Sequence, residues 1–148
     1  GDRGAGVSAR LQEEPLDPWA TLAAHQGARP GSYGATAVFV GTMRDLNEGA
    51  GVTAMTLEHY PEMTRRHLER IAQEARERWT LDDVLVVHRH GDLAPGDPIV
   101  LVAAWSAHRD AAFAACRYLI EELKHRAPFW KKESGPEGER WVERNTPP

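Results

Sequence analysis

Two apolar runs lie between two long helical patterns in this chain, and this order limits the folds open to it. The runs 84–88 and 99–106 are rich in Val, Ile and Leu, and a segment with turn chemistry separates them, so they are predicted to pair as strands. Apolar residues recur at helical spacing over 61–79 and 109–126, with charged residues between them. The first of these helices is expected to cover one face of the sheet, which gives an α+β fold.

Shorter elements complete this prediction. Residues 7–11 could form an edge strand, and Asp17 followed by Pro18 predicts the N-cap and first turn of a short helix. The run 35–40 is predicted to be a strand covered on both faces, with 52–59 as its antiparallel return strand in a hairpin.

The length and composition favour one soluble domain. The 148 residues are 41% hydrophobic and 27% charged, which is ordinary for a globular protein. We expect a single domain over 7–144, a flexible N-terminus at 1–6 and a short tail at 145–148. The sequence shows neither a membrane-spanning run nor the apolar core of a signal peptide, so a cytoplasmic location is expected.

The only cysteine, Cys116, excludes an internal disulfide and a site made of several thiolates. It lies within the second long helical pattern, on a predicted apolar stripe with Phe113, Ile120 and Leu123. We therefore expect Cys116 to be a small buried hydrophobe rather than a reactive thiol.

Charge is uneven along the chain. The net charge of −4 argues against general nucleic-acid binding, which depends on neutralising many phosphates. Residues 124–144 nevertheless hold six Lys or Arg against four Glu, so this segment carries +2 and the remainder −6. A local basic region in an acidic protein suits a small anionic ligand better than a polyanion.

The basic segment contains an unusual boundary between apolar and charged residues. Phe129 and Trp130 favour burial, whereas Lys131 and Lys132 favour water, so a buried strand is predicted to emerge at a charged edge. Together with Lys124, these lysines could surround an anion. The alternative is a solvated basic turn that follows a core strand.

A second candidate site lies where the strand 99–106 passes into the second long helix. Unpaired backbone N–H groups at a helix start favour anions, and His108 and Arg109 add side chains suited to phosphate. Alternatively, His108 caps the helix and Arg109 is solvated.

Other motifs predict no chemistry of their own. His88 and His90 lack a third metal ligand nearby, and Tyr60 is more typical of a core residue with a bonded hydroxyl than of an acid. The sequence contains no nucleophile elbow, phosphate loop or dinucleotide fingerprint. These patterns indicate a protein that positions reagents supplied by others, with Lys and Arg stabilising negative charge.

The predicted helix length separates the two cationic groups. Arg109 and Lys124 are fifteen residues apart on one helix, which corresponds to roughly 22 Å at 1.5 Å per residue. One small ligand could hardly contact both in one chain. We therefore expect a site shared across a symmetric dimer, in which each chain supplies one group.

Several motifs in order resemble the MoaE family, the catalytic (large) subunit of molybdopterin synthase. The resemblance covers about 34–142 and is carried by Phe39-Val40-Gly41-Thr42-Met43-Arg44, Leu57-Glu58-His59-Tyr60-Pro61-Glu62-Met63, His88-Arg89-His90-Gly91-Asp92-Leu93, Ala107-His108-Arg109, Leu123-Lys124 and Ala127-Pro128-Phe129-Trp130-Lys131-Lys132-Glu133.

This resemblance implies an α/β hammerhead-type fold with an additional antiparallel β subdomain. It also implies a central homodimer flanked by two small ubiquitin-like sulfur-carrier subunits, whose C-terminal Gly-Gly thiocarboxylate enters the large subunit. Two sulfurs would then pass stepwise to cyclic pyranopterin monophosphate and form the dithiolene of molybdopterin. No resident cofactor or metal is expected, and the partner would supply the sulfur that this chain lacks.

The resemblance also assigns residues. Lys124 and Lys131 match the catalytic lysines, and the matches to the substrate pocket are Thr42, Met43, Arg44, His108, Arg109, Lys132 and Glu133. Met43 stands at a variable position, and residues 1–6 have no counterpart in the family. The sequence ends in Thr146-Pro147-Pro148 rather than Gly-Gly, so a separate carrier is required.

Two alternatives compete with this function. The first is a non-catalytic module that binds a ubiquitin-like tail through the same basic pocket, and the second, more distant, is a pterin-binding dehydratase. Arg44, His108 and Arg109 favour the sulfurtransferase, because a module that only binds a tail needs no second anion site.

Overall fold

The computed structural model describes residues 6–44, 46–47, 50–51, 54–59, 61–126, 129–135 and 138–142, with non-glycine side chains described over 6–44 and 62–125. Its elements, in chain order, are β1 (Val7–Gln12), α1 (Pro18–Ala24), β2 (Ala35–Thr42), β3 (Leu46–Asn47), β4 (Ala50–Gly51), β5 (Ala54–His59), α2 (Pro61–Trp79), β6 (Asp83–Arg89), β7 (Gly91–Leu93), β8 (Pro98–Ser106), α3 (Arg109–Arg126), β9 (Phe129–Gly135) and β10 (Gly138–Val142).

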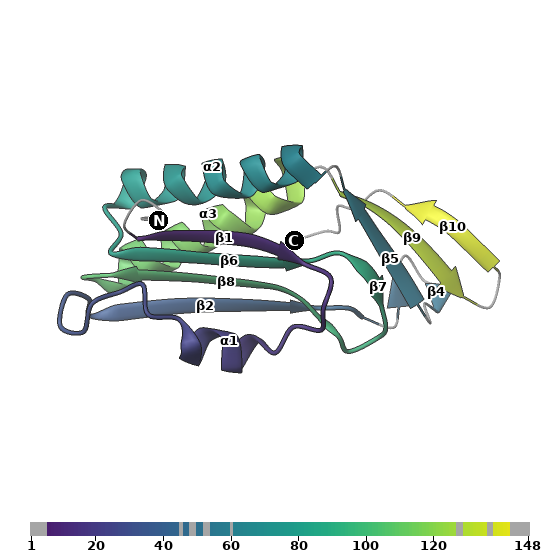
Figure 1. Cartoon of the computed structure of the whole chain (residues 1–148), viewed down its shortest axis with the longest axis horizontal. Helices are drawn as coiled ribbons and strands as arrows, with labels where there is room; N and C mark the ends of the chain where they lie inside the picture. The colour runs from purple at the N-terminus through teal and green to yellow at the C-terminus, as the bar shows by residue number, and fades with distance from the viewer. Residues whose placement is uncertain are drawn as a thin grey trace.

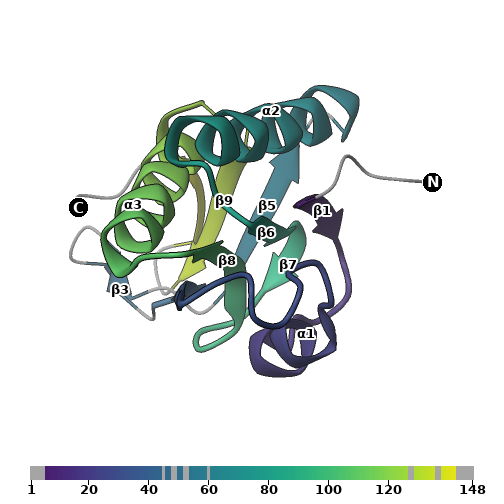
Figure 2. The same cartoon turned by 90° about the vertical axis from the view of Figure 1, so that its left-hand side faces the viewer.

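The main sheet has four strands in the order β1-β6-β8-β2. β1 runs parallel to β6, and the β6–β8 and β8–β2 pairs are antiparallel. α2 and α3 cover one face of this sheet and the short helix α1 lies against the other, as Figures 1 and 2 show. The side-chain period of 2 along a strand gives each face its own set of apolar residues.

Two apolar clusters hold these layers together. The larger lies between the sheet and the two long helices, with Val84, Val86 and Leu119 fully buried. The smaller lies under α1, where Leu85, Val87 and Leu101 are buried beside Trp105. The central strands β6 and β8 are therefore apolar on both faces, which explains why they read as nearly continuous Val, Leu and Ala runs.

A second, antiparallel sheet lies at one end of the main sheet (Figure 1). Its order is β10-β9-β5-β7, and β3 and β4 form a separate two-stranded ribbon. β9 is central in it and pairs with both β5 and β10. The main sheet with its helices and the second sheet beside it confirm the expected α+β fold with an additional antiparallel β subdomain.

Most of the predicted elements are confirmed. β1, β6 and β8 occupy the expected runs, and both long helices have the expected bounds. Asp17 caps α1 as expected, since its side chain accepts a hydrogen bond from the Ala20 N–H at 3.0 Å. The boundaries of the domain remain a prediction, and residues 1–5 and 143–148 lie outside the described part of the chain.

The predicted hairpin between 35–40 and 52–59 is wrong. β2 pairs with β8, whereas β5 belongs to the second sheet. β2 is also an edge strand and is not covered on both faces, because Thr36 is exposed and Val38 retains 36% exposure. Nearness in sequence suggested the hairpin. However, β8 is longer than β5 and pairs with β2 along the whole length of β2.

The predicted burial of Phe113 on the apolar stripe of α3 is also wrong. Its side chain is 67% exposed, whereas Cys116 and Leu123 of the same predicted stripe are buried and Ile120 is partly buried. The stripe of α3 that faces the hydrophobic core is instead formed by Ala112, Ala115, Cys116, Leu119 and Leu123. Small alanines let α3 approach the sheet closely, and Phe113 lies outside that contact.

A buried polar pair attaches α1 to the sheet. His25 Nε2 lies 2.6 Å from Asp83 Oδ2, and the Asp83 side chain is only 1% exposed. The second carboxylate oxygen accepts a hydrogen bond from the Val84 N–H, and the His25 ring packs on Trp105 at 5.2 Å between centroids. A Cβ at Gly27 would collide with Asp83 Oδ2, so only glycine fits beside this pair.

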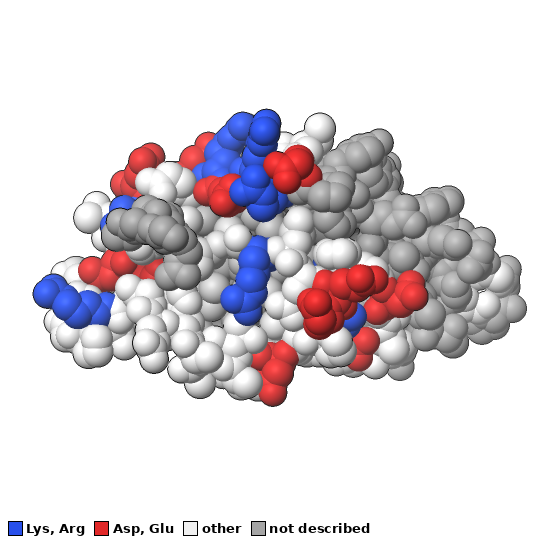
Figure 3. Space-filling model, viewed as in Figure 1, with Lys and Arg blue, Asp and Glu red and all other residues white. Residues whose placement is uncertain are grey.

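The outer face of α2 is solvated. Arg65 bridges Glu62 and Glu69 at 3.0 and 2.9 Å, and Figure 3 shows basic and acidic side chains gathered together over this helix. Exposed pairs of this kind stabilise a helix by a few tenths of a kcal/mol each. Within the described residues, no helix is both long and apolar enough to cross a bilayer.

Candidate functional site

Thr42, Met43 and Arg44 lie at the end of β2 that adjoins the second sheet (Figure 1). Thr42 and Arg44 are exposed, whereas the Met43 side chain between them is 5% exposed and packs in the larger cluster. The Met43 N–H donates to the Asp97 carbonyl at 2.9 Å, and its own carbonyl accepts from the Gly96 N–H at 2.8 Å. Met43 thus anchors the strand end that presents its two exposed neighbours.

The turn that holds Met43 is itself fixed by a buried arginine. Arg89 is 6% exposed, donates to the Glu13 carbonyl at 2.8 Å and lies 3.6 Å from the Asp97 carboxylate. Asp97 also accepts a hydrogen bond from the Ala94 N–H, and Gly96 in this turn has φ +91°, a left-handed value that favours glycine.

Arg89 and Asp97 were not among the predicted site residues, although they position Thr42 and Arg44 indirectly. Turn chemistry was predicted between the runs 84–88 and 99–106, but His88-Arg89-His90 was considered only as a possible metal motif and as part of the family resemblance. The signal available in the sequence was Arg89 itself, a basic residue within a predicted buried strand. A buried guanidinium must find hydrogen-bond acceptors, so such a residue indicates a structural contact. Within the described residues, no cluster of three metal-ligating side chains is present.

Lys124 lies in the last turn of α3, at the end of the helix that approaches the second sheet (Figure 1). Its side chain is partly buried, and the preceding Leu123 is 6% exposed and anchors this turn in the core. The chain then enters β9 at Phe129. The helix end therefore brings Lys124 to the same end of the molecule as Thr42 and Arg44.

Lys131, Lys132 and Glu133 form the middle of β9. They pair with Leu57, Thr56 and Met55 of β5 on one side and with Val142, Trp141 and Arg140 of β10 on the other. Their side chains lie outside the described part of the structure. The predicted strand that begins with Phe129 and Trp130 is confirmed, although it extends to Gly135 rather than ending before Ser134.

His108 and Arg109 lie where β8 passes into α3, and both side chains are exposed. The His108 N–H donates to the Ser106 hydroxyl at 3.4 Å, and its carbonyl accepts from the Ala112 N–H at 3.4 Å. Ser106 pairs with Ala35, so this junction lies beside the start of β2. Within the described structure neither side chain has a hydrogen-bond or ion-pair partner, and the helix start adds unpaired N–H groups that favour an anion.

One chain does not bring all the candidates together. Thr42, Arg44 and Lys124 lie toward the second sheet, whereas His108 and Arg109 lie at the opposite end of α3 (Figure 1). The fifteen residues from Arg109 to Lys124 correspond to roughly 22 Å along the observed helix. The predicted helix is confirmed, and so is the separation that follows from it.

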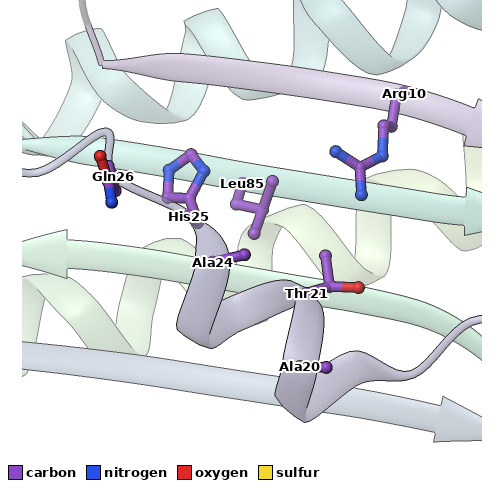
Figure 4. A pocket seen from close by; sticks show the side chains of 7 residues that line it. All are labelled: Arg10, Ala20, Thr21, Ala24, His25, Gln26 and Leu85. Atoms are coloured by element: carbon purple, nitrogen blue, oxygen red, sulfur yellow. The ribbon is translucent and has the colours of Figure 1, made fainter.

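A hollow of about 580 Å³ lies elsewhere, between α1 and the sheet. Figure 4 shows Arg10 at one end of it and His25 and Gln26 toward the other, with Leu85 between them. None of the predicted site residues lines this hollow.

The Cys116 thiol is buried, and burial in an apolar environment raises its pKa to about 11. Removing the thiolate from water disfavours ionisation, so almost no nucleophilic thiolate is present near neutral pH. The prediction of a small buried hydrophobe is confirmed.

The chain matches the model of the family described as MoaE protein over residues 11–126. The molybdopterin synthase catalytic subunit of Ralstonia nicotianae is 52% identical over 134 residues, which cover 90% of this chain and 76% of that protein.

Solved structures agree with this match. A molybdopterin biosynthesis MoaE protein from Burkholderia ambifaria has a TM-score of 0.79 at 50% identity, covering 95% of this chain and 92% of its own. Molybdopterin synthase from Staphylococcus aureus has a TM-score of 0.82 at 31% identity, covering 90% of this chain and 96% of its own. The resemblance drawn from the motifs is thereby confirmed.

Proposed function

The chain belongs to the MoaE family, and from this premise we propose that it is the catalytic subunit of a molybdopterin synthase. In this proposal it transfers sulfur to cyclic pyranopterin monophosphate to form the dithiolene of molybdopterin. The observation that carries the proposal is the 52% identity to such a catalytic subunit over 90% of the chain. The exposed side chains of Arg44, His108 and Arg109 offer hydrogen-bond donors and positive charge that are compatible with a phosphorylated substrate.

The sulfur is proposed to arrive on a partner. A small ubiquitin-like carrier, MoaD-like in character, would insert its C-terminal Gly-Gly thiocarboxylate near Lys124 and Lys131. An external sulfur source supports this proposal, because the one cysteine of the chain is buried and burial raises its pKa, so it supplies little thiolate near neutral pH. We place the reaction in the cytoplasm, where a lone thiol remains reduced.

The proposed residue roles follow from charge and position. Lys124 and Lys131 would bind the thiocarboxylate end of the carrier and assist proton transfer as sulfur adds. Arg44, His108 and Arg109 would hold the phosphate and the pterin, and Thr42, Met43, Lys132 and Glu133 would complete the pocket. Because the Met43 side chain is buried, its contribution would come from its backbone and from fixing its neighbours.

The site is proposed to be shared by two chains. The helix length keeps Arg109 about 22 Å from Lys124 within one chain, which exceeds the reach of a small pterin. In a symmetric dimer, Lys124 and Lys131 of one chain would face His108 and Arg109 of the other. Two such sites per homodimer, each with its own carrier, would form a heterotetramer.

A reconstitution experiment tests this function. The purified chain is mixed with a thiocarboxylated carrier and cyclic pyranopterin monophosphate, and dithiolene formation is followed over time. Product is expected only with the thiocarboxylated carrier, and the same carrier with an ordinary carboxylate is the control. Carrier binding without product would instead support a non-catalytic module that binds a ubiquitin-like tail.

A further inference from the structure

The hollow of about 580 Å³ between α1 and the main sheet is bounded by short side chains of the helix. Ala20, Thr21 and Ala24 line it, and their spacing places them on one side of α1. Leu22, on the other side of the helix, packs against the smaller apolar cluster. Because alanine and threonine are short, space remains between helix and strands, and its volume lies within the roughly 300–1,000 Å³ of small-molecule pockets.

Arg10 faces this hollow from β1. Side chains alternate along a strand, and Val7, Ala9 and Leu11 pack against the larger cluster, so Arg10 lies on the face that α1 covers. Figure 4 shows its guanidinium group turned toward α1. Within the part of the chain that the structure describes, Arg10 has no hydrogen-bond or ion-pair partner, and no acidic residue lines the hollow. Its forked donors are therefore available to an anion.

The opposite end of the hollow carries polar groups in a fixed place. His25 is held by its 2.6 Å contact with Asp83, whose side chain is 1% exposed. Gln26 follows His25, and its side-chain amide, which has no hydrogen-bond partner among the described residues, can both donate and accept. Leu85 supplies apolar surface between the two ends (Figure 4).

Strand register gives the distance between these ends. Arg10 pairs with Val87, whereas His25 contacts Asp83, which lies four residues earlier on β6. Four residues of a strand correspond to roughly 13 Å. A ligand that reaches both ends is therefore elongated, with an anionic group beside Arg10 and a polar edge beside Gln26.

We propose that this hollow binds a heteroaromatic monophosphate, whether a purine nucleotide or a phosphorylated pterin. The phosphate accepts paired hydrogen bonds from Arg10 and a further one from the Thr21 hydroxyl. The flat ring lies over Leu85 and Ala24, and its polar edge exchanges hydrogen bonds with the Gln26 amide. An aromatic carboxylate offers the same charge but no acceptor at the far end.

This site goes beyond the proposed function. None of the residues proposed for sulfur transfer or for the substrate pocket lines the hollow. The ligand is therefore bound by a second site, on the face of the sheet opposite α2 and α3 (Figure 2).

Calorimetric titration of the purified protein with guanosine monophosphate tests the site without carrier. Guanosine monophosphate is expected to bind at least tenfold more tightly than guanosine or inorganic phosphate, because each of these lacks one half of the proposed contacts. Neopterin monophosphate, titrated in parallel, distinguishes the two sources, and the tighter of the two phosphates identifies the ring that the site prefers. No binding of either phosphate, or equal affinities for guanosine monophosphate and guanosine, would overturn the inference.

Two pairs of variants locate the binding. Ala24→Phe fills the hollow from α1 and is expected to weaken binding at least tenfold. Ala23→Phe is the matched control, because Ala23 is also exposed on α1 but does not line the hollow. Arg10→Gln removes the cation and is expected to weaken binding at least tenfold, whereas Arg29→Gln, exposed outside the hollow, is expected to leave it unchanged.

Binding that is lost in Arg109→Gln but retained in Arg10→Gln would reject the hollow, because the ligand would then occupy the proposed substrate pocket. Equal losses in Ala24→Phe and Ala23→Phe would reject it as well. The reconstitution assay separates the two proposals, since Arg10→Gln is expected to form the dithiolene at the unmodified rate. Failure of the nucleotide titrations would therefore leave the proposed function intact, and failure of the reconstitution would leave the hollow to be judged by the titrations.

Discussion

The two ends of α3 both carry cations, but the helix favours them at only one end. Lys124 lies in the last turn, where the partial negative charge of the helix stabilises it. Arg109 lies at the start, where the partial positive charge opposes it, although Asp110 in the same turn supplies a negative charge. Cations at an electrostatically unfavourable position, exposed and without a partner among the described residues, indicate a ligand more strongly than cations that the helix itself stabilises.

The largest expected effect on activity comes from replacing Lys124, at the end of α3 where the helix stabilises a cation. Lys124→Ala should lower the rate of dithiolene formation by about 100- to 1000-fold, because it removes a cation from the proposed thiocarboxylate site. The initial rate with saturating carrier measures this loss, and light scattering checks that the dimer persists. Near-normal turnover by Lys124→Ala would remove this residue from the mechanism.

Replacing Arg109, at the start of α3 where the helix disfavours a cation, should change activity and stability in opposite directions. Arg109→Ala is expected to lower activity by about 10- to 100-fold through weaker binding of the substrate phosphate. It should also raise the free energy of unfolding by about 0.3–1 kcal/mol, because a cation leaves the helix start. Urea unfolding at low ionic strength measures the second effect. Arg117→Ala in the middle of the helix is the control, and it is expected to lower stability by about 0.3–0.5 kcal/mol because it removes the exposed ion pair with Glu121 at 2.7 Å. A loss of stability on replacing Arg109 would contradict the comparison between the two ends.

Mixing the two variants tests whether the ends of different chains cooperate. Co-expression of Lys124→Ala with Arg109→Ala gives mixed dimers in which one of the two shared sites has both cations. Random pairing makes half of the dimers mixed, so about a quarter of the unmodified activity should return. Lys124→Ala co-expressed with Lys124→Ala/Arg109→Ala is the control, since no site then regains both groups. Equal activity in both mixtures would argue for sites within single chains.

The smallest effect is expected at Cys116, which lies between the two ends of α3, and it concerns the pH dependence of stability. The raised pKa of Cys116, about 11, means that the folded state keeps the thiol proton to higher pH than the unfolded state, whose thiol has a pKa near 9.0. Stability from this group is therefore fully present below pH 9 and is lost as pH rises from 9 toward 11. Unfolding by urea across this range should show a smaller pH dependence for Cys116→Ala. Rapid reaction of the folded protein with a thiol reagent at pH 8 would contradict the burial that causes the shift.

Helices and central strands could be predicted because their signals are local. The periodicity of 61–79 and 109–126 and the apolar runs of β6 and β8 depend on residues close together in sequence. The partner of β2 could not be predicted in this way, since pairing with β8 rather than 52–59 depends on tertiary packing. Phe113 was misplaced because its helical spacing fits a broad stripe, and only the alanines around it reveal how narrow the true contact is.

The residues of the candidate site stay a prediction, and the contacts that support them could not be predicted from the sequence. Lys124, His108 and Arg109 were identified from residue type and from their positions at helix ends. Arg89 and Asp97, which fix Met43 and hence the end of β2, are joined by contacts between segments distant in sequence. The buried pair of His25 and Asp83 was missed for the same reason, because fifty-eight positions separate its members.

The parallel pairing of β1 with β6 has a consequence for how the chain folds. Val7 pairs with Val84 and Gln12 with Arg89, so β1 cannot join the sheet until β6 has been synthesised. β2 must likewise await β8, which follows β6 in the chain. Both edge strands are made before the two central strands that receive them, and such long-range pairing slows folding. During synthesis, the apolar side chains of β2 are therefore exposed to other nascent chains before β8 is available.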